Sequence, residues 1–246
     1  MNTTVNKMMT RARRGQWLAL ILGTVTLVAI SRQVRADGGS NDPRVIPPQA
    51  NFRGLSYGEW EAEWWKGLLA IPVVDDVHPF FTGGVFGGHK GVLFPIAPFG
   101  QATVDLTIPA GTPLFLGVMN AECSILEPDP FHGNTEAELR ACANSQIDNT
   151  SGVFAVIDGI AVQNLSHYRG QSPLFEFGPL PGGNIFEYFG LDAPAGTTSW
   201  SVDAGIYLML APLRVGRHTI HVGGTYDLTG LSFDSTFNIT VVPNKP

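Results

Sequence analysis

Residues 54–58 have the pattern Gly-x-Ser-x-Gly, which in some hydrolases places a nucleophilic serine on a sharp turn between a strand and a helix. Asp158 or Asp203, followed by His218, would supply an acid and a base in a suitable chain order. The motif requires a strand before the serine and an earlier oxyanion-hole loop, but only 19 residues separate Ser56 from the export signal predicted below. Ser56 also begins a helical pattern, where its hydroxyl can cap the first turn. We therefore interpret Ser56 as a helix cap.

Glu59 and Glu63 are one helical turn apart and alternate with tryptophans, a combination that could act on a sugar. Retaining glycosidases need two carboxyl groups about 5 to 5.5 Å apart, and inverting enzymes about 6.5 to 9.5 Å. Catalytic carboxylates usually stand on different elements, whereas acids on one side of an amphipathic helix are commonly solvated. Glu59 and Glu63 are thus candidate catalytic residues of a glycoside hydrolase, and solvated helix residues are the alternative.

Aromatic side chains offer a second kind of site, because flat rings can stack on a sugar or hold an apolar ligand. The candidate binding residues are Trp60, Trp64, Trp65 and Tyr168. The same residue types also build hydrophobic cores, so each candidate has a core position as its alternative.

Metal ligands with a recognisable spacing are missing from the sequence. The six histidines are scattered, without a His-Glu-x-x-His motif or paired cysteine ligands. His218 and His221 would point to opposite faces of a strand. Residues 75–78, Asp-Asp-Val-His, could bind a metal only if their loop folded back on itself. We expect no metal and no cofactor.

The first 36 residues resemble an export signal. They contain a basic lead, a stretch at 17–30 without any charged residue, and a small-residue cleavage site between Ala36 and Asp37. Those 14 residues are fewer than the roughly 20 that a membrane span needs. We expect a periplasmic or extracellular protein without membrane insertion after cleavage. Arg13 and Arg14 leave both the general and the twin-arginine export routes open.

Removal of residues 1–36 would change the charge of the chain. Six of the 15 basic residues and none of the 21 acidic ones lie in that segment, so nine basic residues would remain and the net charge would be −12. Such a surface repels phosphate backbones and anionic lipid. We expect no nucleic-acid partner, and a glycan, a small ligand or another protein as the possible partner.

The chain has two cysteines, Cys123 and Cys142. An oxidising compartment favours their pairing, and the bridge would contribute about 3 kcal/mol in the chain-entropy description. Two buried free thiols are the alternative.

The elements around these residues indicate a mainly β protein with two helices. Ser56 and Glu59 form a capping box that begins a helix ending near residue 69, and Thr135 with Glu138 begins a short helix carrying Cys142. Abundant glycine (29 residues) and proline (18 residues) indicate short strands joined by turns.

Strand patterns follow at residues 101–108 and 113–119, and the Asp-Gly pair at 158–159 predicts a hairpin. We expect an antiparallel β-sandwich, immunoglobulin-like or jelly-roll-like, over residues 52–246, after an extended lead-in at 37–51. Residues 213–242 resemble the closing hairpin of immunoglobulin-like modules.

Several short motifs are distributed over most of the chain beyond residue 36. They are Tyr-Gly-Glu-Trp at 57–60, Trp-Trp at 64–65, Pro-Ala-Gly-Thr-Pro-Leu-Phe at 109–115 with Asn120, and Leu-Arg-Val-Gly-Arg-His-Thr-Ile at 213–220. Together they resemble a group of exported bacterial proteins of uncharacterised function. The resemblance implies a bacterial, extracytoplasmic setting and a single domain, and it assigns no catalytic residue. From the sequence we expect a non-enzymatic binding or structural module, with an exported glycoside hydrolase as the alternative.

Overall fold

The computed structural model describes residues 45–244. The predicted signal at 1–36, its cleavage site between Ala36 and Asp37, and most of the predicted lead-in lie outside the described residues. Within residues 45–244, no helix is both long and apolar enough to cross a membrane.

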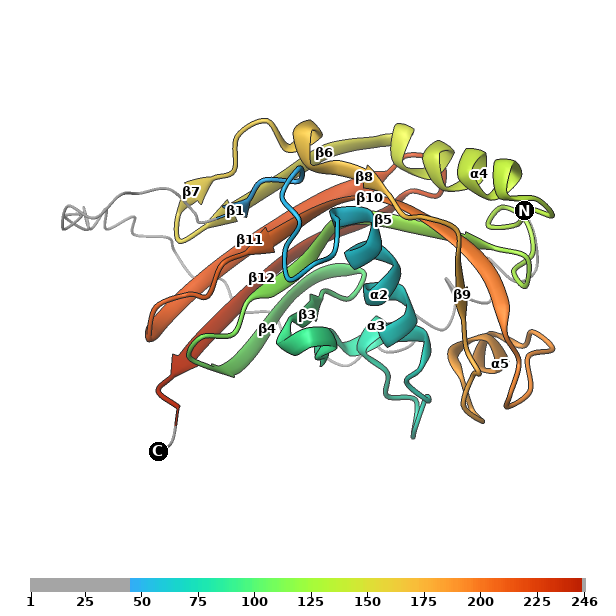
Figure 1. Ribbon diagram of the computed structural model, residues 1–246, viewed down its shortest axis with the longest axis horizontal. Coiled ribbons are helices and arrows are strands. Elements are labelled where there is room, and N and C mark those ends of the chain that lie inside the picture. Colours follow the sequence, from blue (N-terminus) through green and yellow to red (C-terminus); the bar gives the residue numbers. More distant parts are fainter. Residues whose placement is uncertain (1–44, 245–246) are drawn as a thin grey trace, which may run out of the picture.

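Two mixed β-sheets packed face to face form the body of the described chain (Figure 1). In the larger sheet, β10 pairs with β5 on one side and with β1, β8 and β9 on the other. Its strands are β1 (Val45–Ile46), β2 (Gly84–Gly87), β3 (Leu93–Ile96), β5 (Leu114–Ser124), β8 (Arg169–Gln171), β9 (Phe175–Phe177) and β10 (Ser199–Leu210). The smaller sheet has the order β4-β12-β11-β6-β7, with β4 (Gly100–Pro109), β6 (Thr150–Ile157), β7 (Ile160–Ala161), β11 (Gly216–Tyr226) and β12 (Leu231–Val242).

This architecture confirms the predicted β-sandwich, with one difference in strand direction. The pairs β4 with β12 and β3 with β5 are parallel, so neither sheet is purely antiparallel. A parallel pair needs a long connection between its strands, and the elements between β4 and β12 provide it. Alternation of apolar and polar residues along β4 shows which face is buried but cannot show which strand is its neighbour.

Four α-helices accompany the sheets within the described residues: α2 (Tyr57–Leu69), α3 (Pro79–Thr82), α4 (Glu136–Asp148) and α5 (Ile185–Phe189). Helix α2 lies on the outer face of the larger sheet, and α4 lies against β5 and β10 (Figure 1). The capping box of α2 is confirmed, because the Ser56 hydroxyl accepts from Glu59 N and the Glu59 carboxylate accepts from Ser56 N. The short helices α3 and α5 were not predicted.

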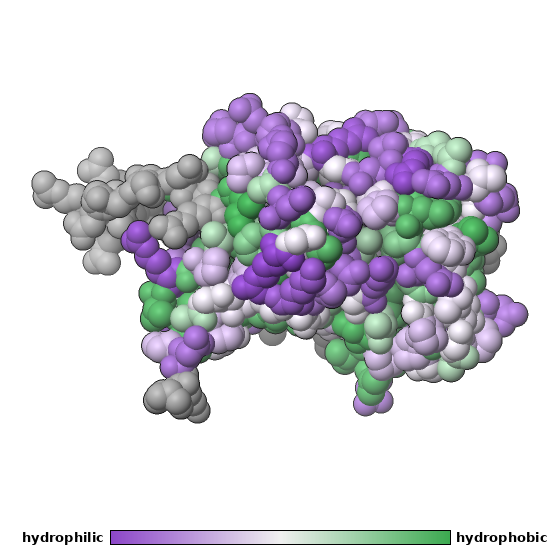
Figure 2. Space-filling model, in the orientation of Figure 1, coloured by the Kyte–Doolittle hydropathy of each residue, from purple (hydrophilic) through white to green (hydrophobic). Residues whose placement is uncertain are grey.

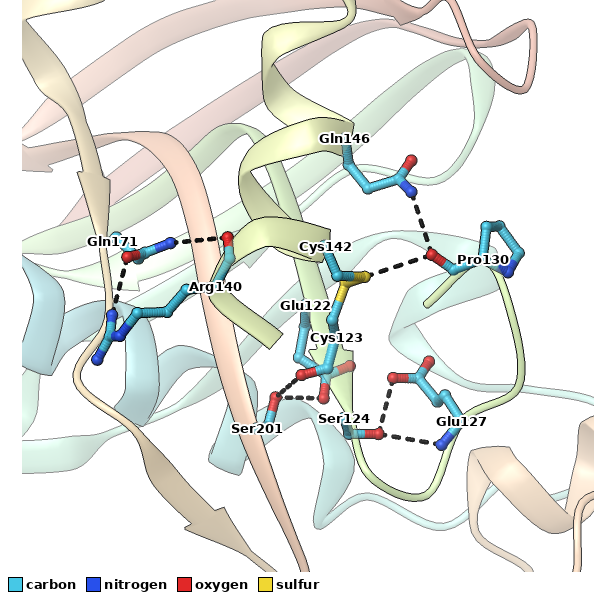
Figure 3. Close-up of a disulfide and its surroundings, with 10 residues drawn as sticks. All are labelled: Glu122, Cys123, Ser124, Glu127, Pro130, Arg140, Cys142, Gln146, Gln171 and Ser201. Carbon is cyan, nitrogen blue, oxygen red and sulfur yellow. Dashed lines mark hydrogen bonds between the residues drawn. A yellow bond between two sulfur atoms is a disulfide. The ribbon is translucent and has the colours of Figure 1, made fainter. Parts of the chain in front are cut away.

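The disulfide between Cys123 of β5 and Cys142 of α4 is confirmed, with 6.2 Å between the Cα atoms (Figure 3). Thr135 caps α4 as predicted, but Glu138 reaches back to the amide of Asn134 and not to that of Thr135. The bridge therefore holds α4 against the end of β5.

The predicted Asp-Gly turn also joins two strands as expected. Ile157 of β6 pairs with Ile160 of β7, and both Asp158 (φ 50°) and Gly159 (φ 80°) adopt the left-handed backbone that a type I′ turn requires.

The two faces of the larger sheet differ in chemistry, and this difference positions the site. Toward the smaller sheet and α4, β10 presents Val202, Ala204, Ile206 and Leu208, all in the hydrophobic core. On the opposite face, alternation along the strand places Ser201, Asp203, Tyr207 and Met209, of which Tyr207 and Met209 pack in the cluster beneath α2.

Candidate functional site

Acidic side chains lie where a β-sandwich normally buries apolar ones. Asp203 of β10 and Glu122 of β5 are direct cross-strand partners, 0% and 5% exposed respectively. Like charges at opposed positions of a sheet are destabilising, and buried carboxylates without partners are costly. The chain therefore retains two acids at a position that stability alone would not favour.

A cavity of about 190 Å³ lies beside Glu122. Helices α2, α3 and α5 and the loop after β5 contribute aromatic side chains to its wall, including Trp64, Trp65, Phe80, Phe81, Phe131 and Phe189. A few polar side chains interrupt that wall, among them Asn120, Glu122, Glu127 and Gln146. In Figure 2, apolar surface is visible at the end of the molecule where α3 and α5 lie. The cavity is therefore mainly aromatic, with a small polar region.

Glu122 and Glu127 form the acidic part of this polar region. Their carboxyl groups hydrogen bond to each other. Ser124 Oγ donates to Glu127 Oε2 over 2.9 Å and accepts from Glu127 N over 3.2 Å. Figure 3 shows the Glu127 carboxyl group turned toward Ser124 and Glu122. Ser124, the last residue of β5, thus holds the following loop so that the carboxyl group of Glu127 lies next to that of Glu122.

The hydroxyl of Ser201 touches the same network from β10. It lies within hydrogen-bond distance of Glu122 Oε1, and it is 2.9 Å from the carbonyl oxygen of Cys123. A hydroxyl has a single proton to donate, so Ser201 cannot donate to both oxygens at once. When Ser201 donates to Cys123, a protonated Glu122 completes the network by donating to Ser201. The geometry therefore accommodates a neutral carboxyl group at Glu122.

Burial makes both Glu122 and Glu127 weaker acids. It raises the pKa of Glu122, although hydrogen bonds from Glu127 and Ser201 counteract part of the rise. Burial raises the pKa of Glu127 well above its usual range, and the neighbouring Glu122 raises it further. The pair consequently holds protons at a pH where exposed glutamates are ionised.

Asp203 and Tyr207 extend the polar network under α2. The indole Nε1 of Trp65 donates to Asp203 Oδ1 over 2.7 Å, and Asn120 Nδ2 donates to the Tyr207 hydroxyl over 2.7 Å. Burial raises the pKa of Asp203 well above its usual range, and the donors Tyr207 and Trp65 offset this only in part. Asp203 is thus a buried acid that α2 covers with a tryptophan.

Glu61 of α2 completes the row of buried acids. It is 0% exposed, and neither of its carboxyl oxygens has a hydrogen-bond partner among the described residues. Burial raises its pKa well above the usual range, and the nearby Asp203 adds to the rise. Gly170 of β8 leaves room for it, since a Cβ at this position would collide with Glu61 Oε1. Neither Glu61 nor Asp203 is part of the cavity wall.

The two glutamates proposed from the sequence as catalytic residues do not lie at this cavity. Glu59 is exposed and is held in the capping box, where its hydrogen bonds with Ser56 lower its pKa. Glu63 forms an ion pair with Lys66 at 3.1 Å, and His89 Nδ1 lies 3.1 Å from its other carboxyl oxygen. Neither glutamate is part of the cavity wall.

The four aromatic candidates are divided between the core and the cavity. Trp60 is 0% exposed and donates to the carbonyl of Phe52, which makes it a core residue. Trp64 and Trp65 line the cavity. Tyr168 is partly buried and packs beside the core clusters, outside the cavity wall.

The serine, acid and histidine of the hydrolase motif are not assembled as a triad. The Ser56 hydroxyl is used within the α2 cap, and Asp203 is bonded to Trp65. His218 Nδ1 does lie 2.7 Å from Asp158, on the β11 side of the smaller sheet. Within residues 45–244, no group of three or more His, Cys, Asp or Glu side chains is arranged to hold a metal ion.

Sequence reasoning missed Glu61, Glu122 and Glu127 as site residues. A signal for Glu122 was present, since it is the charged residue of a mostly apolar strand whose two faces are both covered. For Glu61 a signal was also present, because a helical wheel places it on the apolar face of α2 beside Tyr57 and Trp65. Only the fold shows that β8 covers it.

The fold and the site define a class of protein, a β-sandwich whose outer helix closes an aromatic cavity with buried acids. No protein-family model and no curated protein matches the chain. The solved structure of PbICP-C in complex with falcipain-2 contains a chain with 11% identity and a TM-score of 0.22, covering 58% of this chain and 90% of that one. A TM-score this low supports no inference about fold or function.

Proposed function

We propose that this chain is a non-enzymatic binding module that holds a small, mainly apolar ligand in the cavity beneath α2. The observation that carries the proposal is the cavity of about 190 Å³, whose wall is aromatic except for a few convergent polar groups. Ligand sites in proteins have this composition, with apolar contacts for affinity and few polar groups for orientation. Apolar cavities of about 150 Å³ remain dry and bind benzene, so the volume here suits one ring with a short substituent.

The residues of the cavity wall favour a small ligand over the other two partners considered from the sequence. A glycan presents many hydroxyl groups, and the aromatic wall offers few side chains to pair with them. A protein partner would require an exposed surface, whereas Trp64, Leu68 and Phe186 of this wall are all at least 97% buried.

A glycoside hydrolase is the second candidate function, and one observation favours it. Glu122 and Glu127 bring two carboxyl groups with raised pKa values together beside Trp64 and Trp65, and a general acid needs a raised pKa. However, the two groups are hydrogen bonded to each other and so leave no space for a glycosidic bond between them. A panel of chromogenic glycosides tests this candidate, and we expect no hydrolysis above background.

An exported location is part of the proposal. The disulfide between Cys123 and Cys142 supports it, because such bridges persist in oxidising compartments. The resemblance to exported bacterial proteins points to the same setting. N-terminal sequencing of the protein recovered from the periplasm or medium should begin at Asp37, and recovery only in the cytoplasm with residues 1–36 retained would contradict it.

The binding proposal is tested by calorimetric titration of benzyl alcohol and indole into the purified protein. We expect saturable binding to the wild type and at least a tenfold weaker affinity in Ala97→Phe, which places a ring in the cavity wall. Ala161→Phe is the matched control, since Ala161 is exposed on β7 and outside that wall. Equal affinity in both variants, or no binding to the wild type, would contradict the proposal.

A further inference from the structure

We infer that the ligand of this cavity is a small organic cation, an ammonium group attached to an apolar or aromatic body. This inference rests on the proposed binding function and adds the charge of the ligand to it. Three features of the cavity carry it: the acidic pair, the aromatic wall and an unpaired donor.

The first feature is an acidic pair without a basic partner. Glu122 and Glu127 both line the cavity, and no Lys, Arg or His side chain is among the described residues of its wall. In Figure 3 the guanidinium group of Arg140 points toward Gln171, away from the two glutamates. Arg140 is engaged instead by Glu136, Gln171 and the carbonyl of Ser172. A cationic group entering the cavity would favour loss of a proton from the pair to solvent, and the resulting carboxylate would face it without a competing positive charge.

The second feature is the aromatic wall around that pair. Rings of Trp64, Trp65, Phe80, Phe81 and Phe131 line the same cavity. A cation within about 6 Å of an aromatic face is attracted by the negative face of the ring, and the attraction is strongest where water is excluded. A neutral ligand gains apolar contacts with these rings but not the cation–π attraction, and an anion would be repelled by Glu122 once that carboxyl group ionises.

The third feature is an unpaired donor on the cavity wall. Trp64 is only 3% exposed, and its indole N–H has no hydrogen-bond partner among the described residues. A buried donor left unpaired is costly, and a ring face or an oxygen of the ligand would satisfy it. The residues that line the cavity thus match an ammonium group at the glutamates and an electron-rich body at Trp64.

A set of three isosteric probes tests the inference in the full protein. Benzylamine, benzyl alcohol and benzoate have similar size but carry positive, zero and negative charge at neutral pH. By calorimetry at pH 7.5, we expect benzylamine to bind at least about tenfold more tightly than benzyl alcohol, and benzoate not to bind.

Variants then test whether Glu122 and Glu127 cause the preference for the positively charged probe. Glu127→Gln and Glu122→Gln should bring benzylamine to within about threefold of benzyl alcohol, while Glu63→Gln, outside the cavity wall, should leave the preference intact. If the alcohol binds as tightly as the amine, the inference is overturned and the binding function remains. If none of the three probes binds, both fail. The probe comparison uses only wild-type protein, so it decides the matter even where a variant does not fold.

Discussion

The indole Nε1 of Trp65 donates a 2.7 Å hydrogen bond to the carboxyl group of Asp203. The bond joins α2 to the centre of the larger sheet, and Trp65 also lines the cavity. Trp65 thus contacts both the buried Asp203 and the cavity whose wall includes Glu122, the cross-strand partner of Asp203. Trp65 therefore links the stability of the buried acids to the shape of the candidate ligand site.

Replacing Trp65 should be costly because Asp203 would lose its donor. We expect Trp65→Phe to lower the free energy of unfolding by about 1–3 kcal/mol, which is typical when a buried polar group loses its partner. Chemical denaturation at pH 7 measures this change. In Asp203→Ala protein, which lacks the acceptor, the same Trp65→Phe change should cost less, and equal costs in both backgrounds would show that the 2.7 Å bond has no energetic role.

The pH dependence of stability should reflect the buried acids. A carboxyl group whose pKa is raised in the folded protein stabilises it fully below the unfolded pKa of about 4, and this contribution is lost as pH rises through the folded pKa. Four described carboxyl groups have raised pKa values: Glu61, Glu122, Glu127 and Asp203. We therefore expect the melting temperature to fall between pH 6.5 and pH 8.5.

Two groups act in the opposite direction but at lower pH. The pKa of Glu59 is lowered by its cap and that of His78 by burial, so their contributions are lost as pH falls. Between pH 6.5 and pH 7.5 only His78 still adds to stability, and above about pH 7.5 both contributions are essentially constant. A melting temperature that rises from pH 6.5 to pH 8.5 would contradict the raised pKa values.

Glu61→Gln should isolate one of these acids. The variant removes a group whose pKa is well above its usual range in the fold but not in the unfolded chain, so it should flatten the pH slope by up to about 1.4 kcal/mol per pH unit and increase stability at pH 8. Glu63→Gln on the same helix is the control, because Glu63 is partly exposed and ion-paired. Identical pH slopes in the wild type and Glu61→Gln would rule out a buried neutral Glu61.

Gly170→Ala tests the fit of Glu61 against β8. An added Cβ would collide with Glu61 Oε1, and overpacking of this kind typically costs about 1–3 kcal/mol. Gly182→Ala is the matched control, since its nearest neighbour would be 3.8 Å away. The cost at Gly170 should shrink in a Glu61→Ala background. Equal melting temperatures for the two single alanine variants would show that Glu61 does not pack against Gly170.

Reduction of the disulfide should destabilise the protein while leaving its fold intact. Cys123 and Cys142 are 19 positions apart, and closing such a loop contributes about 3 kcal/mol in the chain-entropy description. Denaturant unfolding of the double variant Cys123→Ala and Cys142→Ala should show this loss. If reductant lowers the stability of the wild type and the double variant equally, its effect does not arise from this bridge.

Local patterns were sufficient to predict the β-sandwich, the α2 cap, the Asp-Gly hairpin and the disulfide partners. Each of these depends on residues close in sequence or, for the cysteines, on there being only two. The parallel strand pairs depend on which distant strands become neighbours, and α3 and α5 are too short to have a periodic pattern. For such features a single sequence contains no local signal.

The candidate site was predicted only in part, for the same physical reason. Trp64 and Trp65 were found because tryptophans are conspicuous anywhere. Glu122 and Asp203 meet only through the register of β5 and β10, strands about 80 residues apart in the chain. Glu59 and Glu63 were proposed because of their helical spacing. In this fold Glu59 caps α2 and Glu63 forms a surface ion pair.

The most direct test of ligand binding is a crystal structure of the full protein with 4-bromobenzylamine. We expect the anomalous bromine peak among the aromatic residues of the cavity and the amine within hydrogen-bond distance of Glu122 or Glu127. An empty cavity, or bromine bound only elsewhere on the protein, would contradict the proposed binding function. Bromine placed at the two glutamates, with the amine at the opposite end, would instead contradict the cationic ligand.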